Sequence, residues 1–348
     1  MNKLTKVGCS ALCGSLAAIS AANAGDLSVT GGADLTYTSI GAETTGNPFG
    51  MASAVTFKGA GELDNGWNFE FVVAEGDQVA FSAARVNITM GGLGTFEFDG
   101  GNSGNGIAAY DNVLPTAWEE AHGAGLSGGV KTVLGVGSSN NIQYVTPTVL
   151  GTSIAVTYAH EVGVSDTADK SVSGASNVTT GAGYDATIKI NPSLGTEILS
   201  GLNLYAGGSV IEQYDNSNTN EDKYEAVGAV TYALGPVEIG AMWSGLYDGN
   251  ETGTGAFTGY KNHGFGVAFN VNDDLSVSYG EYQTRKATYT NSNVQVEEAN
   301  RVVEVTSWQA AYTMGGASFR VADVKADNVL FVAGADQNAT IVSMSLAF

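Results

Sequence analysis

Apolar and polar residues alternate with a period of two through most of the chain after residue 26. Clear cases are 67–74, where Trp67, Phe69 and Phe71 alternate with other residues, and 265–271. A period of two places successive side chains on opposite faces of a strand, so these runs predict β-strands. No stretch shows a sustained 3.6-residue apolar repeat with caps, and we therefore expect almost no helix.

The alternating runs are separated by segments rich in Gly, Asn, Asp and Ser, which are typical of turns and loops. Together they predict sixteen strands, at 27–38, 51–63, 66–75, 79–91, 93–99, 140–147, 152–161, 181–191, 200–213, 222–234, 236–247, 261–272, 274–284, 301–314, 316–325 and 338–348. Short turns near 64–65, 234–236, 272–274 and 315–316 alternate with long polar loops over 162–180, 248–260 and 285–300. An even strand number and this alternation are typical of bacterial transmembrane barrels.

The charged residues of these strands indicate which face meets lipid. Most of them stand in the row opposite the large apolar residues, namely Lys58, Glu70, Arg85, Glu97, Lys189 and Glu238. Glu281 and Asp323 are exceptions, which we place near strand ends. Because a basic side chain facing mid-bilayer lipid costs about 2–4 kcal/mol, the apolar row is expected to face hydrocarbon.

A water-soluble β-sandwich would show the same alternation. Sixteen long strands with small residues in their polar rows leave no second sheet to pack on, however. We therefore predict an all-β fold, a sixteen-stranded antiparallel transmembrane β-barrel.

The first residues are typical of a secretion signal. Lys3 and Lys6 precede a mostly small and apolar stretch, and Ala22-Asn23-Ala24 fits the small-x-small cleavage pattern. We predict a Sec signal peptide over 1–24 and a barrel over 25–348. Both cysteines, Cys9 and Cys13, would leave with the signal, so disulfides are not expected to hold the mature barrel.

The composition limits the partners. The formal charge of the chain is −21, and removing 1–24 takes away two lysines and no acid, which leaves −23. A chain this acidic repels nucleic acid, so nucleic-acid partners are excluded. Charged residues make up 14% of the chain, against about 25% in average soluble proteins. The low share is consistent with strands that face lipid.

The chain ends on an alternating strand whose last residue is aromatic. Val342, Met344, Leu346 and the terminal Phe348 share one face of the predicted strand 338–348. Chain termini are usually frayed and polar. This ending is therefore a further indication of a barrel.

In the order and spacing of these segments the mature chain resembles the Gram-negative general porins, especially the alphaproteobacterial type. The segments that carry the resemblance are 25–29 (GDLSV), 55–59 (VTFKG), 91–98 (GGLGTFEF) and the terminal Phe348. The resemblance implies an outer-membrane location with surrounding lipid, a homotrimer, and delivery to the barrel-assembly machinery through a C-terminal signal that includes Phe348. It also implies a long third loop folded into the lumen.

The loop in question is 100–139, which shows no strand-like alternation. A loop this long in a compact protein is usually functional or disordered. As an inward constriction, its acids would face basic residues of early strands across the pore. The candidate pore-lining residues are then Lys58, Arg85, Glu97, Asp99, Asp111, Glu119 and Glu120. The alternative is a mobile surface loop whose acids are merely solvated.

These features predict a passive diffusion channel for small hydrophilic solutes and ions. Acidic rings favour cations, so we expect a mild cation preference. No cofactor is expected, although clustered carboxylates could hold a structural Ca²⁺; the candidates are Asp99, Asp111, Glu119 and Glu120. Chance proximity of these acids is the competing interpretation.

No enzymatic activity is expected. Residues 125–129 match the G-x-S-x-G pattern but lie in a glycine-rich loop without the strand–turn–helix context that the nucleophile needs. The alternatives are a substrate-specific outer-membrane channel and a soluble, acidic surface-layer or adhesin protein.

Overall fold

Most residues that the structure describes lie in β-strands whose backbones are hydrogen-bonded to those of neighbouring strands. The computed structural model describes residues 25–41, 46–77, 79–100, 104–163, 180–192, 197–214, 221–249, 257–290 and 294–348. The predicted signal peptide, 1–24, lies outside them. The strands are β1 (Asp26–Ile40), β2 (Phe49–Glu62), β3 (Asn68–Gly76), β4 (Val79–Thr89), β5 (Thr95–Gly100), β6 (Asn140–Val145), β7 (Thr152–Ala159), β8 (Thr180–Ile190), β9 (Leu202–Gln213), β10 (Lys223–Leu234), β11 (Val237–Tyr247), β12 (Phe257–Asn270), β13 (Leu275–Thr290), β14 (Val294–Met314), β15 (Ala317–Asp327) and β16 (Gln337–Ala347).

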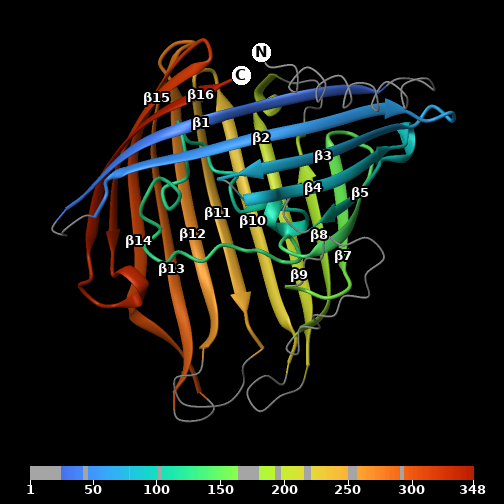
Figure 1. Cartoon of the computed structure of the whole chain (residues 1–348). Helices are drawn as coiled ribbons and strands as arrows, with labels where there is room; N and C mark the ends of the chain where they lie inside the picture. Colours follow the sequence, from blue (N-terminus) through green and yellow to red (C-terminus); the bar gives the residue numbers. More distant parts are fainter. Residues whose placement is uncertain are drawn as a thin grey trace.

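These strands form one closed barrel, in which each pairs antiparallel with its sequence neighbours and β1 pairs with β16 (Figure 1). The β1–β16 ladder runs from Ile40 opposite Ala339 to Gly32 opposite Ala347. Gly31 and Phe348 extend it, since each N–H donates to the carbonyl of the other, at 3.1 and 2.9 Å. The predicted sixteen-stranded antiparallel barrel is confirmed.

The two faces of each strand differ as the alternation predicted. On β11, Ile239 and Trp243 are exposed on the outside, whereas Gly240 and Met242 point inward and are buried. An outer surface covered by large apolar side chains and aromatic rings is typical of a barrel that faces hydrocarbon.

Strands β12–β14 are longer than the alternation predicted. Residues 285–300, expected as a loop, lie largely in β13 and β14, whose ladder continues past a register shift to Thr290 opposite Val294. The sequence of this segment is largely polar, so it lacks the apolar alternation that marks a membrane strand. Its backbone groups nevertheless pair between the two strands.

Toward the long-loop end of β13–β15 the faces exchange polarity. Val305 and Val324 point inward and are buried, whereas Asp323 is exposed on the outside. Glu281 also lies on the outside, where it accepts a hydrogen bond from Gln283 Nε2 at 2.9 Å. Its expected position near a strand end was wrong, because β13 continues to Thr290.

Helical turns are few in the described residues. They are the 3₁₀ turns η1 (Gly91–Leu93), η2 (Gly106–Tyr110) and η3 (Val329–Phe331) and the short α2 (Glu197–Ser200). Among the described residues, none of these helices has the length and apolar character needed to cross a membrane.

Candidate functional site

The long segment after β5 runs across the inside of the barrel (Figure 1). Its first turn, η2, contacts β7–β10, and Ile107 of this turn is fully buried. Leu114 and Pro115 then lie against the glycines of β11 and β12. A Cβ atom on Gly240 would come within 2.6 Å of Pro115, and one on Gly266 within 2.7 Å. These inward glycines make the room in which the loop lies.

Two carboxylates of the wall bind the loop backbone. Asp185 of β8 accepts hydrogen bonds from the N–H groups of Ile107 (3.0 Å) and Val136 (3.2 Å). Glu225 of β10 accepts two more from residues 134–135, at 2.7 and 3.0 Å. Both side chains are buried. Hydrogen bonds to charged groups contribute about 1.5–3 kcal/mol each, so these two residues are strong anchors.

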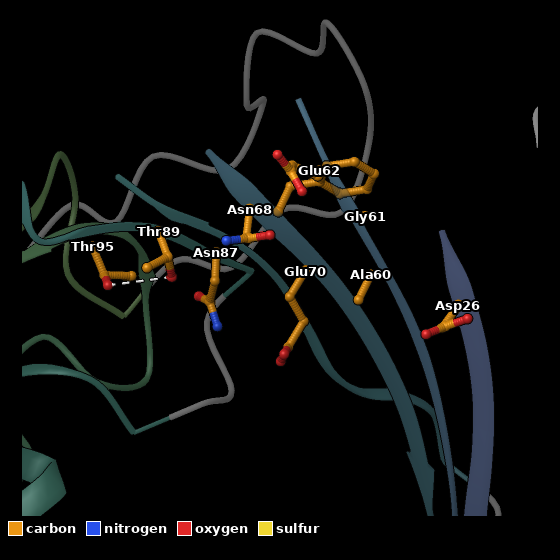
Figure 2. Close-up of a pocket in the computed structure, with 10 residues that line it drawn as sticks. Asp26, Ala60, Gly61, Glu62, Asn68, Glu70, Asn87, Thr89 and Thr95 are labelled. Atoms are coloured by element: carbon orange, nitrogen blue, oxygen red, sulfur yellow. Dashed lines mark hydrogen bonds between the residues drawn. The ribbon is translucent and has the colours of Figure 1, made fainter. Parts of the chain in front are cut away.

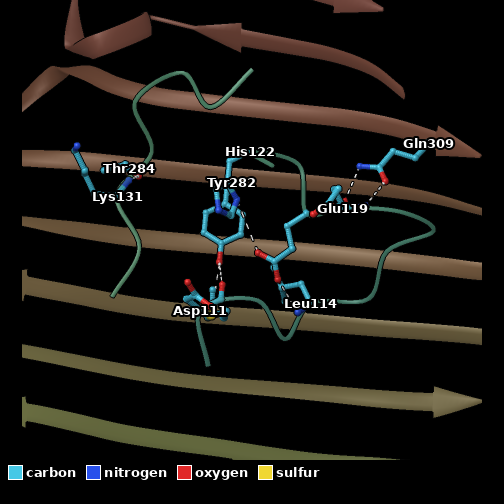
Figure 3. Close-up of polar contacts among 10 residues, drawn as sticks. Asp111, Leu114, Glu119, His122, Lys131, Tyr282, Thr284 and Gln309 are labelled. Atoms are coloured by element: carbon cyan, nitrogen blue, oxygen red, sulfur yellow. Dashed lines mark hydrogen bonds and ion pairs between the residues drawn. The ribbon is translucent and has the colours of Figure 1, made fainter. Parts of the chain in front are cut away.

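Further along, the loop is held by polar side chains of β13 and β14. The Glu119 N–H donates to Gln309 Oε1 at 3.0 Å, and Gln309 Nε2 donates back to the Glu119 carbonyl at 2.7 Å (Figure 3). The Ala117 N–H donates to Ser278 Oγ at 2.9 Å. The loop is thus fixed at intervals along the wall.

A buried polar cluster lies between these anchors. Glu120 Oε1 accepts a hydrogen bond from the Leu114 N–H at 2.9 Å, and its other oxygen lies 3.8 Å from His122 Nδ1. The Tyr282 hydroxyl donates to the Asp111 carbonyl at 3.2 Å, and its ring lies 4.4 Å from that of His122 (Figure 3).

Burial sets the protonation states of this cluster because it disfavours charge. It raises the pKa of Glu120 to about 8 and that of Asp111 to about 6. It lowers the pKa of His122 to about 4. At neutral pH, Glu120 is therefore largely protonated and His122 neutral.

An apolar contact completes the attachment. Ala121 and Leu126 of the loop pack against Val305, Val324 and Ile341 of β14–β16. This contact explains why the inner face of these strands is apolar. We call the wall from β6 to β16, against which the loop lies, the covered wall, and β1–β5 the open wall.

The open wall carries charges that are paired within the wall. Lys58 of β2 forms an ion pair with Glu70 of β3. Arg85 of β4 stands opposite Asp99 of β5 in the ladder, and Glu97 shares their inward row. The basic residues of this wall therefore have carboxylates of the same wall beside them.

A hollow of about 400 Å³ lies on the open wall at the short-turn end of the barrel (Figure 2). Its lining includes the carboxylates of Asp26, Glu62 and Glu70, together with Asn68 and Asn87. The hydroxyls of Thr89 and Thr95, at its rim, are 3.5 Å apart. This end of the lumen is polar and acidic.

The seven predicted pore-lining residues occupy different environments. Lys58, Arg85 and Glu97 lie in the inward rows of the open wall, and Glu119 is exposed on the loop. Asp111 is half-buried. Asp99 and Glu120 were wrongly expected to line the pore, since they are only 0% and 6% exposed. Their carboxylates instead accept hydrogen bonds from Asn141 and Leu114.

The four carboxylates considered for Ca²⁺ are divided between two places. Asp99 lies at the β5–β6 ladder, and the other three, Asp111, Glu119 and Glu120, belong to the loop. In the portion of the chain that the structure describes, no group of three or more His, Cys, Asp or Glu side chains could hold a metal ion.

Sequence reasoning missed the residues that position the loop. Three of these residues, Asp185, Glu225 and Tyr282, stand in inward rows of regular strands. Asp34 and Arg320 stand in such rows too, and they form an ion pair with each other. Their inward orientation follows from the alternation. What each one touches depends on the path of the loop, which the pattern does not contain.

A closed barrel with an apolar outer surface, a polar interior and a loop fixed inside it defines the class of outer-membrane diffusion channels. The model of the Gram-negative porin family matches residues 8–348. The chain belongs to this family and is an outer-membrane porin, a channel and not an enzyme.

Solved structures agree in fold at low sequence identity. The anion-selective porin from Comamonas acidovorans is 12% identical with a TM-score of 0.63, over 93% of this chain and 100% of that one. OmpF of Salmonella typhi, in complex with daunomycin, is 12% identical with a TM-score of 0.66, over 93% and 98%. The trimer form of OmpT from Vibrio cholerae is 11% identical with a TM-score of 0.60, over 93% and 99%. No curated protein sequence matches the chain.

Proposed function

We propose that this porin is a passive, mildly cation-preferring channel for small hydrophilic solutes and ions, and that it works as a homotrimer. The trimer is supported by the similar fold of OmpT, which is known in a trimer form. We further propose that the leader 1–24 is cleaved, and that Phe348 is part of the signal read by the assembly machinery.

The charge balance of the lumen carries the proposed cation preference. Three basic residues of the lumen lie beside carboxylates: Lys58 beside Glu70, Arg85 beside Asp99, and Arg320 beside Asp34. Asp26 and Glu62 line the short-turn end of the lumen, and among the described residues neither has an ion-pair partner. A surplus of acid in a narrow water-filled path raises the local concentration of cations.

The anion-selective porin shares this fold, so fold alone does not determine the sign of selectivity. The test is the zero-current potential of the purified channel in a planar bilayer under a KCl gradient. We expect the sign that corresponds to K⁺ permeating faster than Cl⁻. The opposite sign would contradict the proposed preference, and absence of any current would contradict the channel itself.

A further inference from the structure

Three side chains from distant parts of the sequence meet where the loop reaches the boundary between the two walls. Arg320 of β15 points inward, and its Nη1 lies 3.6 Å from Asp34 Oδ1 of β1. Its guanidinium carbon lies 5.6 Å from the centre of the Trp118 ring. Trp118 belongs to the loop, so this corner lies where the loop narrows the lumen.

A second carboxylate acts on the same corner. Partial burial of its carboxylate raises the pKa of Glu119, the Arg320 guanidinium lowers this pKa, and Asp34 raises it, so the three charges interact with one another. Glu119 is exposed on the loop, and its backbone is fixed by Gln309 at 3.0 and 2.7 Å. One guanidinium therefore lies among two carboxylates and an aromatic face.

The ion pair in this corner is looser than others in the barrel. At 3.6 Å, Arg320 and Asp34 are beyond the range of a good hydrogen bond, and their side chains are 20% and 38% exposed. By comparison, Lys223 lies 2.5 Å from Glu225, whose side chain is fully buried. Arg320 carries five N–H donors, and within the described residues its one ion-pair partner is the loosely placed Asp34, which leaves donors that can bind a solute.

There is also room beside Asp34. A hollow of about 290 Å³ has Asp34 in its lining, together with the small residues Gly32, Ala52, Ala54 and Ser345. Bulky side chains at these positions would fill the space next to the carboxylate. The corner thus has accessible charges of both signs and, on the side of Asp34, a place for a small molecule.

We propose that Asp34, Arg320 and Trp118, with Glu119, form a transit site for small zwitterionic solutes that carry an ammonium and a carboxylate, such as α-amino acids. The solute carboxylate pairs with the Arg320 guanidinium, which matches its planar geometry. The ammonium pairs with Asp34 or Glu119, and apolar atoms lie on the Trp118 ring. A simple cation is repelled by Arg320, and a simple anion is repelled by the carboxylates. Only a solute that carries both charges therefore has a favourable electrostatic interaction at each of its two charged groups.

This inference rests on the proposed channel function and refines its solute class. The interaction between the solute and this site is weak, because the charges are exposed to water and exposed charge pairs contribute little binding free energy. A weak site raises flux at low solute concentration without holding the solute. It is therefore a selectivity element within a diffusion channel and does not require a saturable, tightly binding site.

The test compares two isomers, zwitterionic glycine and uncharged glycolamide, in swelling assays of proteoliposomes. In the unmodified channel we expect glycine to enter about two- to fivefold faster than glycolamide, the range that weak exposed charge pairing produces. Arg320→Gln and Asp34→Asn should each bring the ratio to about one. Lys58→Gln is the matched control, since it removes a lumen cation of the open wall that is directly paired with Glu70, and it should leave the ratio unchanged.

Folding of each variant is checked by the heat-modifiable band of the intact barrel. If Arg320→Gln does not fold, Asp34→Asn and the relative block of K⁺ current by the two isomers in the unmodified channel decide the question. A ratio of one in the unmodified channel with normal KCl conductance, or an unchanged ratio in Arg320→Gln, would overturn the transit site while leaving the channel function intact. Loss of KCl conductance in the unmodified protein would instead overturn the channel.

Discussion

The covered and the open wall of the lumen contain the same kinds of residues in different states. On the covered wall, Asp185 and Glu225 are buried and accept hydrogen bonds from the loop backbone. On the open wall, Lys58 and Glu70 form an ion pair that is partly exposed to the lumen. A carboxylate on one wall therefore positions the loop, whereas a carboxylate on the other remains partly exposed to the lumen.

The difference shows that an inward charge in a barrel does not by itself define a pore residue. A buried charge is out of contact with solutes. Because an unpaired buried charge is costly, such a residue binds neighbouring groups of the protein and so contributes to the structure. On the open wall, Lys58 and Glu70 keep their charges in contact with water, whereas Asp99 is buried. We expect substitutions on the two walls to differ in kind: those on the covered wall change the width of the channel, and those on the open wall change its selectivity.

The largest effect is expected from removing both carboxylate anchors in the variant Asp185→Ala/Glu225→Ala. Four backbone N–H groups then lose their acceptors, at a cost of about 1–3 kcal/mol for each group left buried and unpaired. The start and the end of the loop should detach from the wall. Single-channel conductance and the size limit for neutral sugars measure the result, and both should change clearly.

Glu238→Ala is the matched control for this variant. Glu238 also points inward from the covered wall, on β11, but within the described residues it makes no hydrogen bond to the loop. Its conductance should remain close to that of the unmodified channel. Equal changes in the control and in the double variant would contradict the anchoring role.

A second, smaller effect concerns pH and the covered wall alone. The pKa of Glu120 is raised to about 8 from an ordinary 4.5, so the attached loop binds a proton more tightly than the detached loop. Attachment is therefore strongest below about pH 4.5 as far as Glu120 is concerned, and it weakens as pH rises toward 8, by on the order of 1 kcal/mol per pH unit. The protection factors of the amide hydrogens of residues 118–124, which are corrected for the intrinsic rise of exchange with pH, should fall between pH 6 and about 9.

His122 acts in the opposite direction at lower pH. Burial lowers the pKa of His122 to about 4, so the attached loop binds a proton at this residue less tightly than the detached loop. The attachment of the loop to the wall therefore becomes stronger as pH rises from about 4 to 6.5, and His122 has no effect on it above that range. The loss of protection above pH 6 thus belongs to Glu120. Glu120→Gln should abolish this loss, and its persistence in that variant would show that another group is responsible.

The sequence was sufficient for the barrel but not for the contacts that distinguish the two walls. Strand positions follow from alternation, which the sequence contains directly, and even the terminal Phe348 is placed where it was expected. The extensions of β13 and β14 within 285–300 were not predicted because the sequence of this segment lacks the regular alternation of apolar and polar residues. Asp185, Glu225 and Arg320 were missed because their tasks depend on where the loop lies.

The length of the loop and its lack of alternation were enough to predict the loop. They were not enough to predict which of its residues face the lumen and which face the wall. Asp99 and Glu120 look like surface acids in the sequence. Their burial arises from neighbours that are distant in the chain, such as Asn141 and Tyr282. Such long-range contacts have no local signal in a single sequence.

A third and smaller effect is expected on selectivity when acids of the open wall are neutralised. Asp26→Asn/Glu62→Gln removes two carboxylates from the acidic hollow at the short-turn end. The K⁺/Cl⁻ permeability ratio should fall by about twofold at low salt and less at high salt, because salt screens charges in water. Asp185→Asn, whose buried side chain keeps an acceptor oxygen for the loop N–H groups, should leave this ratio unchanged; a fall of the same size in both would contradict the distinction between the walls.

The smallest effect is expected from Lys58→Gln. Removing this lysine frees Glu70 from its ion pair and makes the open wall more acidic. The permeability ratio should shift slightly toward K⁺, and the folded barrel should lose little stability, since exposed ion pairs contribute about 0–1 kcal/mol. A shift toward Cl⁻ in the reversal potential would contradict this assignment.

The most direct test of the account uses single cysteines at neighbouring positions of β2. Both natural cysteines, Cys9 and Cys13, fall in the predicted leader, so an introduced thiol is expected to be the only one in the processed chain. Thr56 points into the lumen from the open wall, Val55 points outward, and Ser209 lies buried on the covered wall. A water-soluble cationic thiol reagent should reduce the current of Thr56→Cys and leave Val55→Cys and Ser209→Cys unaffected. A current reduced in Val55→Cys, with Thr56→Cys unreactive, would contradict a water-filled lumen along the open wall.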